Sequence, residues 1–172
     1  MHCNICGKDI EKSEGCQVCG LSPEAFELKV QIPTPRGAVN DFPGILTEDQ
    51  VRELSEMVEG FFERTDVPIV ITIVDTTAPL KPAEYAFLLY NHWGIGKPKV
   101  NRGLLLLLCL KEQHLESEVG LGLEKYLPEE TGDWIVQHEF ISHFKERRYF
   151  DGLKAGTAAI IAELEDRLPA TQ

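Results

Sequence analysis

The sequence predicts an α/β domain in which helices cover both faces of a sheet, preceded by a small cysteine-rich segment. Two apolar runs, residues 67–74 and 104–110, have the length and composition of buried strands. Helical patterns flank both runs, and strands enclosed in this way form a three-layer α/β/α sandwich. At 172 residues, the chain has room for one full domain and a small appendage.

The chain is acidic, with 28 acidic and 17 basic residues and a formal net charge of -11. Proteins that bind nucleic acids need a positive surface, so we expect no nucleic-acid partner. No apolar run approaches the ~20 residues of a transmembrane helix, and the chain begins with a polar segment instead of a signal core. We therefore expect a soluble, cytoplasmic protein without a transmembrane segment.

Four of the five cysteines form two CxxC pairs, Cys3 with Cys6 and Cys16 with Cys19. Four thiolates at this spacing suit a tetrahedral zinc site. Two disulfides would suit an exported protein, and a redox pair would be a single CxxC at the start of a helix. Residues 1–20 are too few to bury a core, so we predict a zinc ribbon folded by a structural Zn²⁺. The segment also resembles the short zinc ribbons of many bacterial proteins.

The elements of the main domain follow in order. Residues 21–37 are rich in proline and form a linker, and the main domain occupies residues 38–172. A first helix begins at Thr47, whose side chain and that of Gln50 match a capping box. The strand at 67–74 ends before Asp75. A helix at 82–93 leads to the strand at 104–110, which contains Cys109, expected to be a buried thiol. A hairpin partner at 115–119 and helices at 129–144 and 150–168 complete the domain.

Five segments of the main domain, in this order, resemble the TPM domain family. They read VNDFPGILTEDQVRELSEMV, AEYAFLLYNHWGIGK, NRGLLLLLCL, EVGLGLEKYLPE and HFKERRYFDGL. The resemblance implies an α/β/α sandwich. Members of the family are mostly exported and membrane-anchored. The resemblance also implies chemistry, because some members have acid phosphatase activity and several bind a divalent cation, calcium in particular. Here a predicted zinc ribbon stands where relatives often have a signal peptide, so the membrane association is not carried over.

The resemblance further implies a cation site. Asp41, Asn101 and Glu124 lie in the VND, NRG and GLE motifs, which match the cation-site elements of the family. Their oxygens suit Ca²⁺ or Mg²⁺, which bind six or more oxygen ligands. Relatives often have aspartate where this chain has Asn101, so the affinity for the cation should be lower. Asp75 ends a buried strand, where open α/β sheets bind their ligands, and is a candidate catalytic residue.

Each of these acids also has a structural interpretation. Asp41 and Asp75 suit turns or caps, and Glu124 suits the first turn of a helix. Two functions therefore stay open. The favoured one is a protein-interaction or regulatory module with protein partners. The alternative is a cation-dependent phosphatase, in which the metal polarises a phosphoryl oxygen.

His138 and His143 resemble the zinc-protease motif HExxH with one extra residue. On an α-helix at about 100° per residue, they point in directions about 140° apart, so we expect no shared metal. We expect His138 to be buried or half-buried and His143 to lie on the surface.

Overall fold

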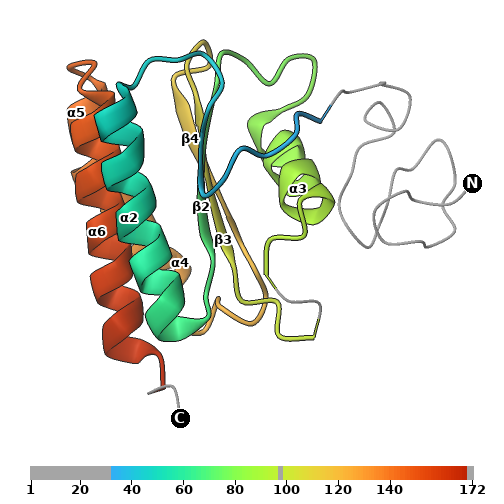
Figure 1. Ribbon diagram of the computed structural model, residues 1–172, viewed down its shortest axis with the longest axis vertical. Helices are drawn as coiled ribbons and strands as arrows, with labels where there is room; N and C mark the ends of the chain where they lie inside the picture. The colour runs from blue at the N-terminus through green and yellow to red at the C-terminus, as the bar shows by residue number, and fades with distance from the viewer. Residues whose placement is uncertain (1–31, 97–98, 170–172) are drawn as a thin grey trace, which may run out of the picture.

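The sheet has four strands in the order β1-β2-β3-β4 (Figure 1). The computed structural model describes residues 32–96 and 99–169. Three strands run parallel, and the fourth runs antiparallel to β3. Parallel neighbours need crossover connections, which two helices provide. The strands and crossover helices are β1 (Val39–Asp41), α2 (Glu48–Thr65), β2 (Ile69–Val74), α3 (Pro82–His92), β3 (Leu104–Cys109) and β4 (His114–Val119).

Helices cover both faces of the sheet, so the predicted three-layer α/β/α sandwich is confirmed. Helix α3 covers one face, and α2, α4 (Glu129–Ile135) and α6 (Tyr149–Arg167) cover the other (Figure 1). The leucines of β3 alternate between the two cores. Leu104, Leu106 and Leu108 face α2 and α6, whereas Leu105 and Leu107 face α3. Because both faces are buried, every position of this strand is apolar.

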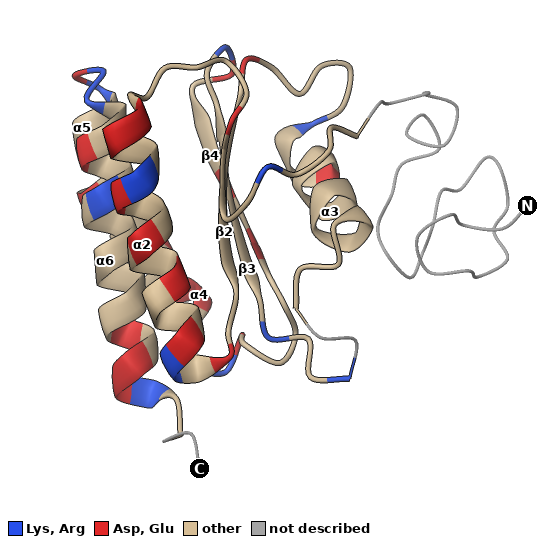
Figure 2. Cartoon of the chain, viewed as in Figure 1, with Lys and Arg blue, Asp and Glu red and all other residues tan. Residues whose placement is uncertain are grey.

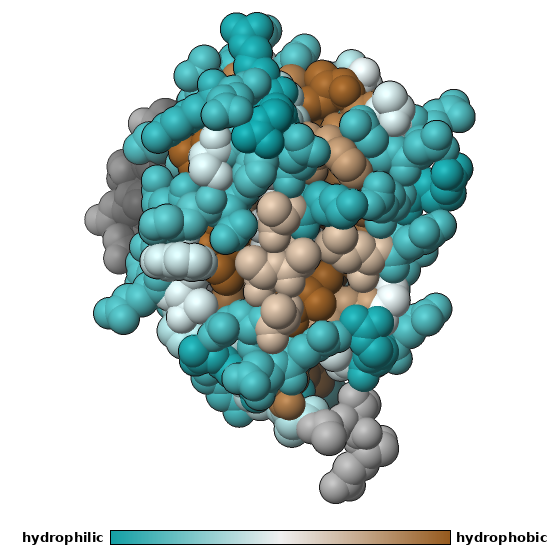
Figure 3. Space-filling view, turned by 90° about the vertical axis from the view of Figure 1, so that its left-hand side faces the viewer, coloured by the Kyte–Doolittle hydropathy of each residue, from teal (hydrophilic) through white to brown (hydrophobic). Residues whose placement is uncertain are grey.

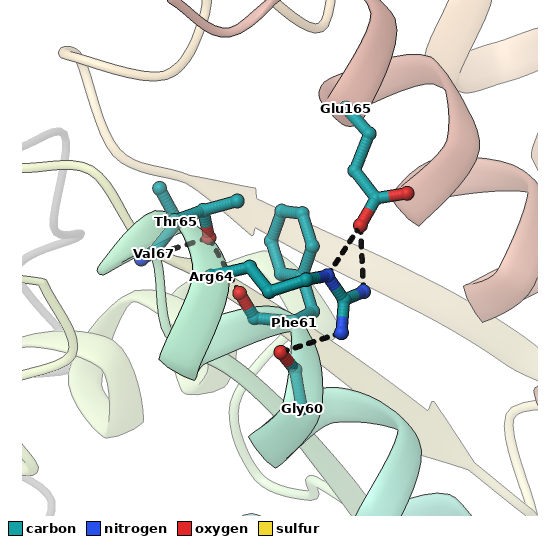
Figure 4. A network of polar contacts seen from close by, with 6 residues as sticks. All are labelled: Gly60, Phe61, Arg64, Thr65, Val67 and Glu165. Atoms are coloured by element: carbon teal, nitrogen blue, oxygen red, sulfur yellow. Dashed lines mark hydrogen bonds and ion pairs between the residues drawn. The ribbon is translucent and has the colours of Figure 1, made fainter. Parts of the chain in front are cut away.

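Helix α2 starts and ends as its sequence indicates. The Thr47 hydroxyl accepts a hydrogen bond from the Gln50 amide, and the Gln50 side chain accepts one from the Thr47 amide, which confirms the capping box. Near the other end, Arg64 donates to Glu165 of α6 through Nε (3.0 Å) and Nη2 (2.6 Å) (Figure 4). Its Nη1 donates to the Gly60 carbonyl at 2.7 Å. This arginine therefore joins the two long helices.

The outward faces of these helices are mostly hydrophilic. Acidic residues are spread along α2 (Figure 2). A small apolar patch lies in the middle of this side of the molecule, surrounded by hydrophilic side chains (Figure 3). Ala158 and Ala162 of α6 are exposed. The outward face of α2 is thus solvated.

Two elements differ from the sequence prediction. Strand β1 is not predicted, because its three residues are too few to show a pattern. The predicted helix at 129–144 consists of α4, a π-helix η1 (Val136–Ile141) and a short turn α5 (Ser142–Phe144). Arg147 follows with a left-handed φ of 58°, and the chain reverses into α6. The predicted zinc ribbon and most of the linker lie outside the described residues.

Candidate functional site

The register of the sheet separates Asp41 from the other two predicted cation ligands. Asp41 pairs with Ile73, which pairs with Leu108 near the carboxyl end of β3. Asn101 instead precedes Leu104, the first residue of β3. Leu104 and Leu108 alone are about 13 Å apart along a strand that rises about 3.3 Å per residue. A calcium ion binds oxygens at about 2.4 Å, so no single ion reaches both Asp41 and Asn101. The combined site implied by the resemblance is therefore not assembled in this fold.

Asp41 lies where the parallel strands have their carboxyl ends, which we call the carboxyl edge of the sheet. Its side chain fixes the loop before α2. Its Oδ1 accepts a hydrogen bond from the Gly44 amide (2.9 Å), and its Oδ2 accepts one from the Leu46 amide (2.8 Å). Both carboxylate oxygens thus accept hydrogen bonds from amides that have no backbone oxygen to donate to in this turn. The local-cap interpretation of Asp41 accounts for this geometry.

Asp75 lies at the same edge and is exposed. Its main-chain oxygen accepts a hydrogen bond from the Lys111 amide at 2.8 Å. The next loop is fixed by Glu112, which accepts hydrogen bonds from the Thr76 hydroxyl (2.5 Å) and the Thr77 amide (3.1 Å). The bond from Thr76 lowers the pKa of Glu112. Sequence reasoning did not single out Glu112, because its partners lie 35 and 36 positions away.

Asn101 lies at the opposite edge, just before β3 begins, and its side chain and main chain both make packing contacts there. It has a left-handed φ of 43°, which asparagine tolerates better than most residues. Its Oδ1 accepts a hydrogen bond from the Tyr90 hydroxyl (2.9 Å), and its main-chain oxygen accepts one from the Gly122 amide (3.0 Å). Burial, and then the charge of Glu118, raises the pKa of Tyr90 to about 12, so the hydroxyl stays a donor.

The glycines of the EVGLGLE motif permit this packing. A Cβ atom on Gly120 would overlap the Asn101 carbonyl oxygen and the Tyr90 hydroxyl, and one on Gly122 would overlap the Val100 carbonyl oxygen. Only glycine allows the backbone segments to lie so close. The NRG and GLG motifs therefore form a backbone contact at this edge of the sheet.

Glu124 follows this contact and lines a groove of about 620 Å³ between β4 and α4. The apolar lining of the groove includes the half-buried Val119 and Val136, which lie over the buried Leu104, Leu106 and Ile160. Its remaining lining is strongly acidic. Its carboxylates come from the turn after β4 and from α4, and they belong to Glu124, Glu129 and Asp133. Glu116 and Glu118 of β4 also border the groove, with their side chains on the α3 face of the sheet.

Glu118, on the α3 face of the strand that borders this groove, has the most strongly raised pKa among these acids. Burial, followed by the charges of Glu116 and Glu124, raises the pKa of Glu118 from 4.5 to about 7. Its carboxylate makes no hydrogen bond or ion pair with the residues that the structure describes. Sequence reasoning missed Glu118. The available signal was the pair Glu116 and Glu118, which share one face of a strand because they are two residues apart.

The carboxyl edge has smaller and more basic cavities. One of about 330 Å³ is lined by Cys109 at the end of β3 and by Lys145 and Arg147 of the turn before α6. A second of about 190 Å³ is lined by Leu46, Arg147 and Arg148. Arg148 pairs with Glu146 and Asp151, at 2.8 and 3.5 Å. This edge could therefore attract an anion.

The cysteine predictions have different outcomes. Cys109 is a free, buried cysteine as predicted, and burial raises its pKa to about 12. Cys3, Cys6, Cys16 and Cys19 lie outside the described residues, so the zinc ribbon stays a prediction. Within residues 32–96 and 99–169, no group of three or more histidine, cysteine, aspartate or glutamate side chains is placed to hold a metal ion.

The exposures predicted for the two histidines were wrong. His138 is exposed and stacks on Trp134 with the ring centroids 4.4 Å apart, whereas His143 is partly buried. The Nδ1 atom of each histidine lies 2.8 Å from the main-chain oxygen four residues earlier. The prediction assumed an α-helix, but a π-helix, with its wider turn, occupies this segment.

The fold and the groove define this protein as a three-layer α/β/α domain with an acidic groove beside its antiparallel edge strand. The chain belongs to the TPM domain family, whose pattern matches residues 39–163. No curated protein sequence matches the chain. Within the described part of the chain, no helix is long and apolar enough to cross a membrane.

Solved structures are similar to this fold. The N-terminal domain of a protein from P. gingivalis has 27% sequence identity and a TM-score of 0.71, over 78% of this chain and 86% of that one. A protein from the psychrophilic bacterium Bizionia argentinensis has 14% identity and a TM-score of 0.67, over 76% and 89%. The N-terminal domain of a Corynebacterium glutamicum protein has 10% identity and a TM-score of 0.61, over 84% and 93%. The last two show likeness of fold alone.

Proposed function

We propose that this TPM domain is a non-enzymatic protein-binding module, and that its contact surface is the acidic groove between β4 and α4. One observation supports this most: the carboxylates of Glu124, Glu129 and Asp133 border a groove of about 620 Å³ that also has apolar lining, and Glu116 and Glu118 add two more on the other face of the adjoining strand β4. Apolar lining with a charged rim is the usual anatomy of a surface that binds another protein. Glu118 adds to this. Its raised pKa means that the charged form of its carboxylate is destabilised, and a cationic partner would stabilise that form.

Photo-crosslinking in cells tests this proposal. A crosslinking amino acid replaces Ser117, an exposed residue of β4 that lines the groove. The matched control carries the same group at Ala158, which is exposed on α6. We expect a protein adduct from position 117 that is absent from position 158 and is lost when Glu118→Lys and Glu124→Lys are combined. Identical adducts from both positions would contradict a specific surface in the groove.

The second candidate is a cation-dependent phosphatase, favoured by the basic cavities at the carboxyl edge. Lys145 and Arg147 line the cavity at the end of β3 and would attract a phosphoryl group. Asp41 and Asp75 lie at the same edge and could bind Ca²⁺ or Mg²⁺, with Asp75 as the candidate catalytic residue. Asn101 and Glu124 would have no part in such a site.

A phosphate-ester assay with added Ca²⁺ or Mg²⁺ separates the two functions. Asp75→Asn is the informative variant, because its side chain is exposed and the change is nearly isosteric. The binding-module proposal expects no metal-dependent turnover by the unmodified chain. Turnover that is abolished by Asp75→Asn and retained by the exposed control Asp49→Asn would make the phosphatase the better assignment.

We also propose that residues 1–20 bind a structural zinc ion through Cys3, Cys6, Cys16 and Cys19, on the strength of their spacing alone. Purified protein should contain about one zinc per chain. Combining Cys3→Ser with Cys6→Ser should remove the metal, whereas Cys109→Ser, outside the two pairs, should retain it. A zinc content far below one per chain would overturn this assignment.

A further inference from the structure

Strand β4 is an outer strand of the sheet, and its unpaired side lies beside the acidic groove. It is the last strand in the order β1-β2-β3-β4, and among the described residues it pairs with β3 alone. An edge strand presents a row of backbone donors and acceptors that an extended peptide can pair with. β4 spans six residues without proline or lysine, which commonly protect such edges.

We propose that the partner of this domain is a segment rich in lysine or arginine that binds in extended conformation along β4, as a fifth strand of the sheet. The inference rests on the proposed function, since it names the chemistry and the binding mode of a partner of the same groove.

The two faces of β4 determine the pattern of the partner. Glu116 and Glu118 pair with Leu107 and Leu105, so they lie on the α3 face of the sheet. Ser117 pairs with Leu106 and lies on the other face, beside the apolar lining of the groove. Side chains of an added strand would alternate in the same way. Basic residues would meet the two glutamates, and the apolar residues between them would enter the groove.

Charge selects against the other occupants of this edge. A second copy of β4 would bring glutamates opposite glutamates, and like charges directly opposite each other destabilise a strand pair. The chain as a whole has a net charge of -11, which also disfavours self-association and binding of nucleic acid. A basic segment gains from the same charges, including those of Glu124, Glu129 and Asp133 on the groove.

NMR titration of the full chain with a short amidated peptide of alternating lysine and valine tests the inference. We expect chemical-shift changes centred on residues 114–119 and slower amide exchange in β4. A peptide of alternating glutamate and valine should not bind. The combined change Glu116→Gln and Glu118→Gln should weaken binding of the lysine peptide about tenfold, since two ion pairs are lost. The matched control, Glu56→Gln with Glu59→Gln on the exposed face of α2, should leave the affinity unchanged.

A second peptide separates strand addition from simple charge attraction. It has the same sequence with N-methylated valines, which keep the charge and the side chains but remove backbone donors. Strand addition predicts that this peptide loses most of its affinity, because the ladder of hydrogen bonds cannot form. Equal binding of both peptides, or no binding of the unmethylated one, would overturn the inference. An adduct from position 117 in cells would then still support the protein-binding function, whereas absence of that adduct as well would overturn both.

Discussion

The carboxyl edge of the sheet and the opposite edge, where the parallel strands begin, are built by different means, although the sequence predicts functional residues at both. At the carboxyl edge, side chains hold the loops: Asp41 accepts from two backbone amides, and Glu112 accepts from the Thr76 hydroxyl and an amide. At the opposite edge, backbone packs on backbone, because Gly120 and Gly122 lie against residues 100 and 101. A carboxylate that accepts hydrogen bonds from a loop has further lone pairs that a ligand could use, whereas a contact between glycine and backbone offers no side-chain group to a ligand. The opposite edge is therefore structural, and binding chemistry belongs to the carboxyl edge or to the groove beside β4.

The strongest test of this difference is Gly122→Ala. The added methyl group would overlap the Val100 carbonyl oxygen, and it would lie 3.1 Å from Cγ of Arg102. Overpacking against backbone is costly, so we expect the free energy of unfolding to fall by about 3 kcal/mol in urea denaturation. Gly132→Ala in α4 is the control, because its Cβ meets open space. It should be neutral or stabilise by up to about 1 kcal/mol. Equal effects of the two changes would disprove the close contact.

At the carboxyl edge, Asp41→Ala should lower the free energy of unfolding by about 2 kcal/mol, since two backbone amides lose their acceptor. Asp75→Ala is the matched control at the same edge. Its side chain is exposed and makes no hydrogen bond within the described residues, so we expect a change within about 0.5 kcal/mol. Thermal unfolding compares the two variants. A larger loss for Asp75→Ala would show that the loop is held differently.

Glu118→Gln tests, through the pH dependence of stability, the acidic cluster that Glu118 forms with Glu116 and Glu124. The pKa of Glu118 is raised to about 7 from 4.5, so between these values the folded state binds more protons than the unfolded state. The free energy of unfolding therefore falls as pH rises from 4.5 to 7. Glutamine has no such charge, and because the site is partly exposed we expect a stabilisation of about 1.5 kcal/mol at pH 8.

The same comparison at pH 4 should show little difference between Glu118→Gln and the unmodified chain, because Glu118 is then largely protonated in both states. Glu56→Gln, on the exposed face of α2, serves as the control. Stability differences that are the same at pH 4 and pH 8 would contradict a titrating Glu118.

The smallest expected effect comes from Tyr90→Phe, which removes the hydroxyl that donates to Asn101 and keeps the packing of the ring. We expect a loss of about 1 kcal/mol. Asn101→Gly should cost a similar amount, since glycine tolerates the φ of 43°, and Asn101→Ala should cost about 1 kcal/mol more. Calcium that stabilised the unmodified chain but not Asn101→Gly would show that this edge binds a cation after all.

Most of the fold follows from local patterns. The apolar runs predict β2 and β3, and the capping box at Thr47 predicts the start of α2. Strand β1 was missed because three residues carry no periodicity, and only pairing with β2 makes them a strand. The π-helix was missed for a related reason. A helical pattern of apolar residues does not distinguish hydrogen bonds between residues four apart from those between residues five apart.

The candidate site was less predictable than the fold. Motif order placed Asp41, Asn101 and Glu124 in one site, but strand direction puts Asp41 at one edge of the sheet and the other two at the opposite edge. Glu118 was overlooked because an acid in a polar strand is ordinary. Its raised pKa depends on burial and on two carboxylates that only the fold brings near.

The sequence by itself determined the family, the three-layer sandwich and the excess of acid, because these depend on motifs, periodicity and composition. The tertiary structure decided which acids act together. Carboxylates interact only over short distances, and distance depends on strand direction, register and the position of α4 beside β4. For this reason the NRG and GLG motifs form a packing contact, while the glutamates of β4 join the acids of the turn after it and of α4 in one acidic region beside the groove.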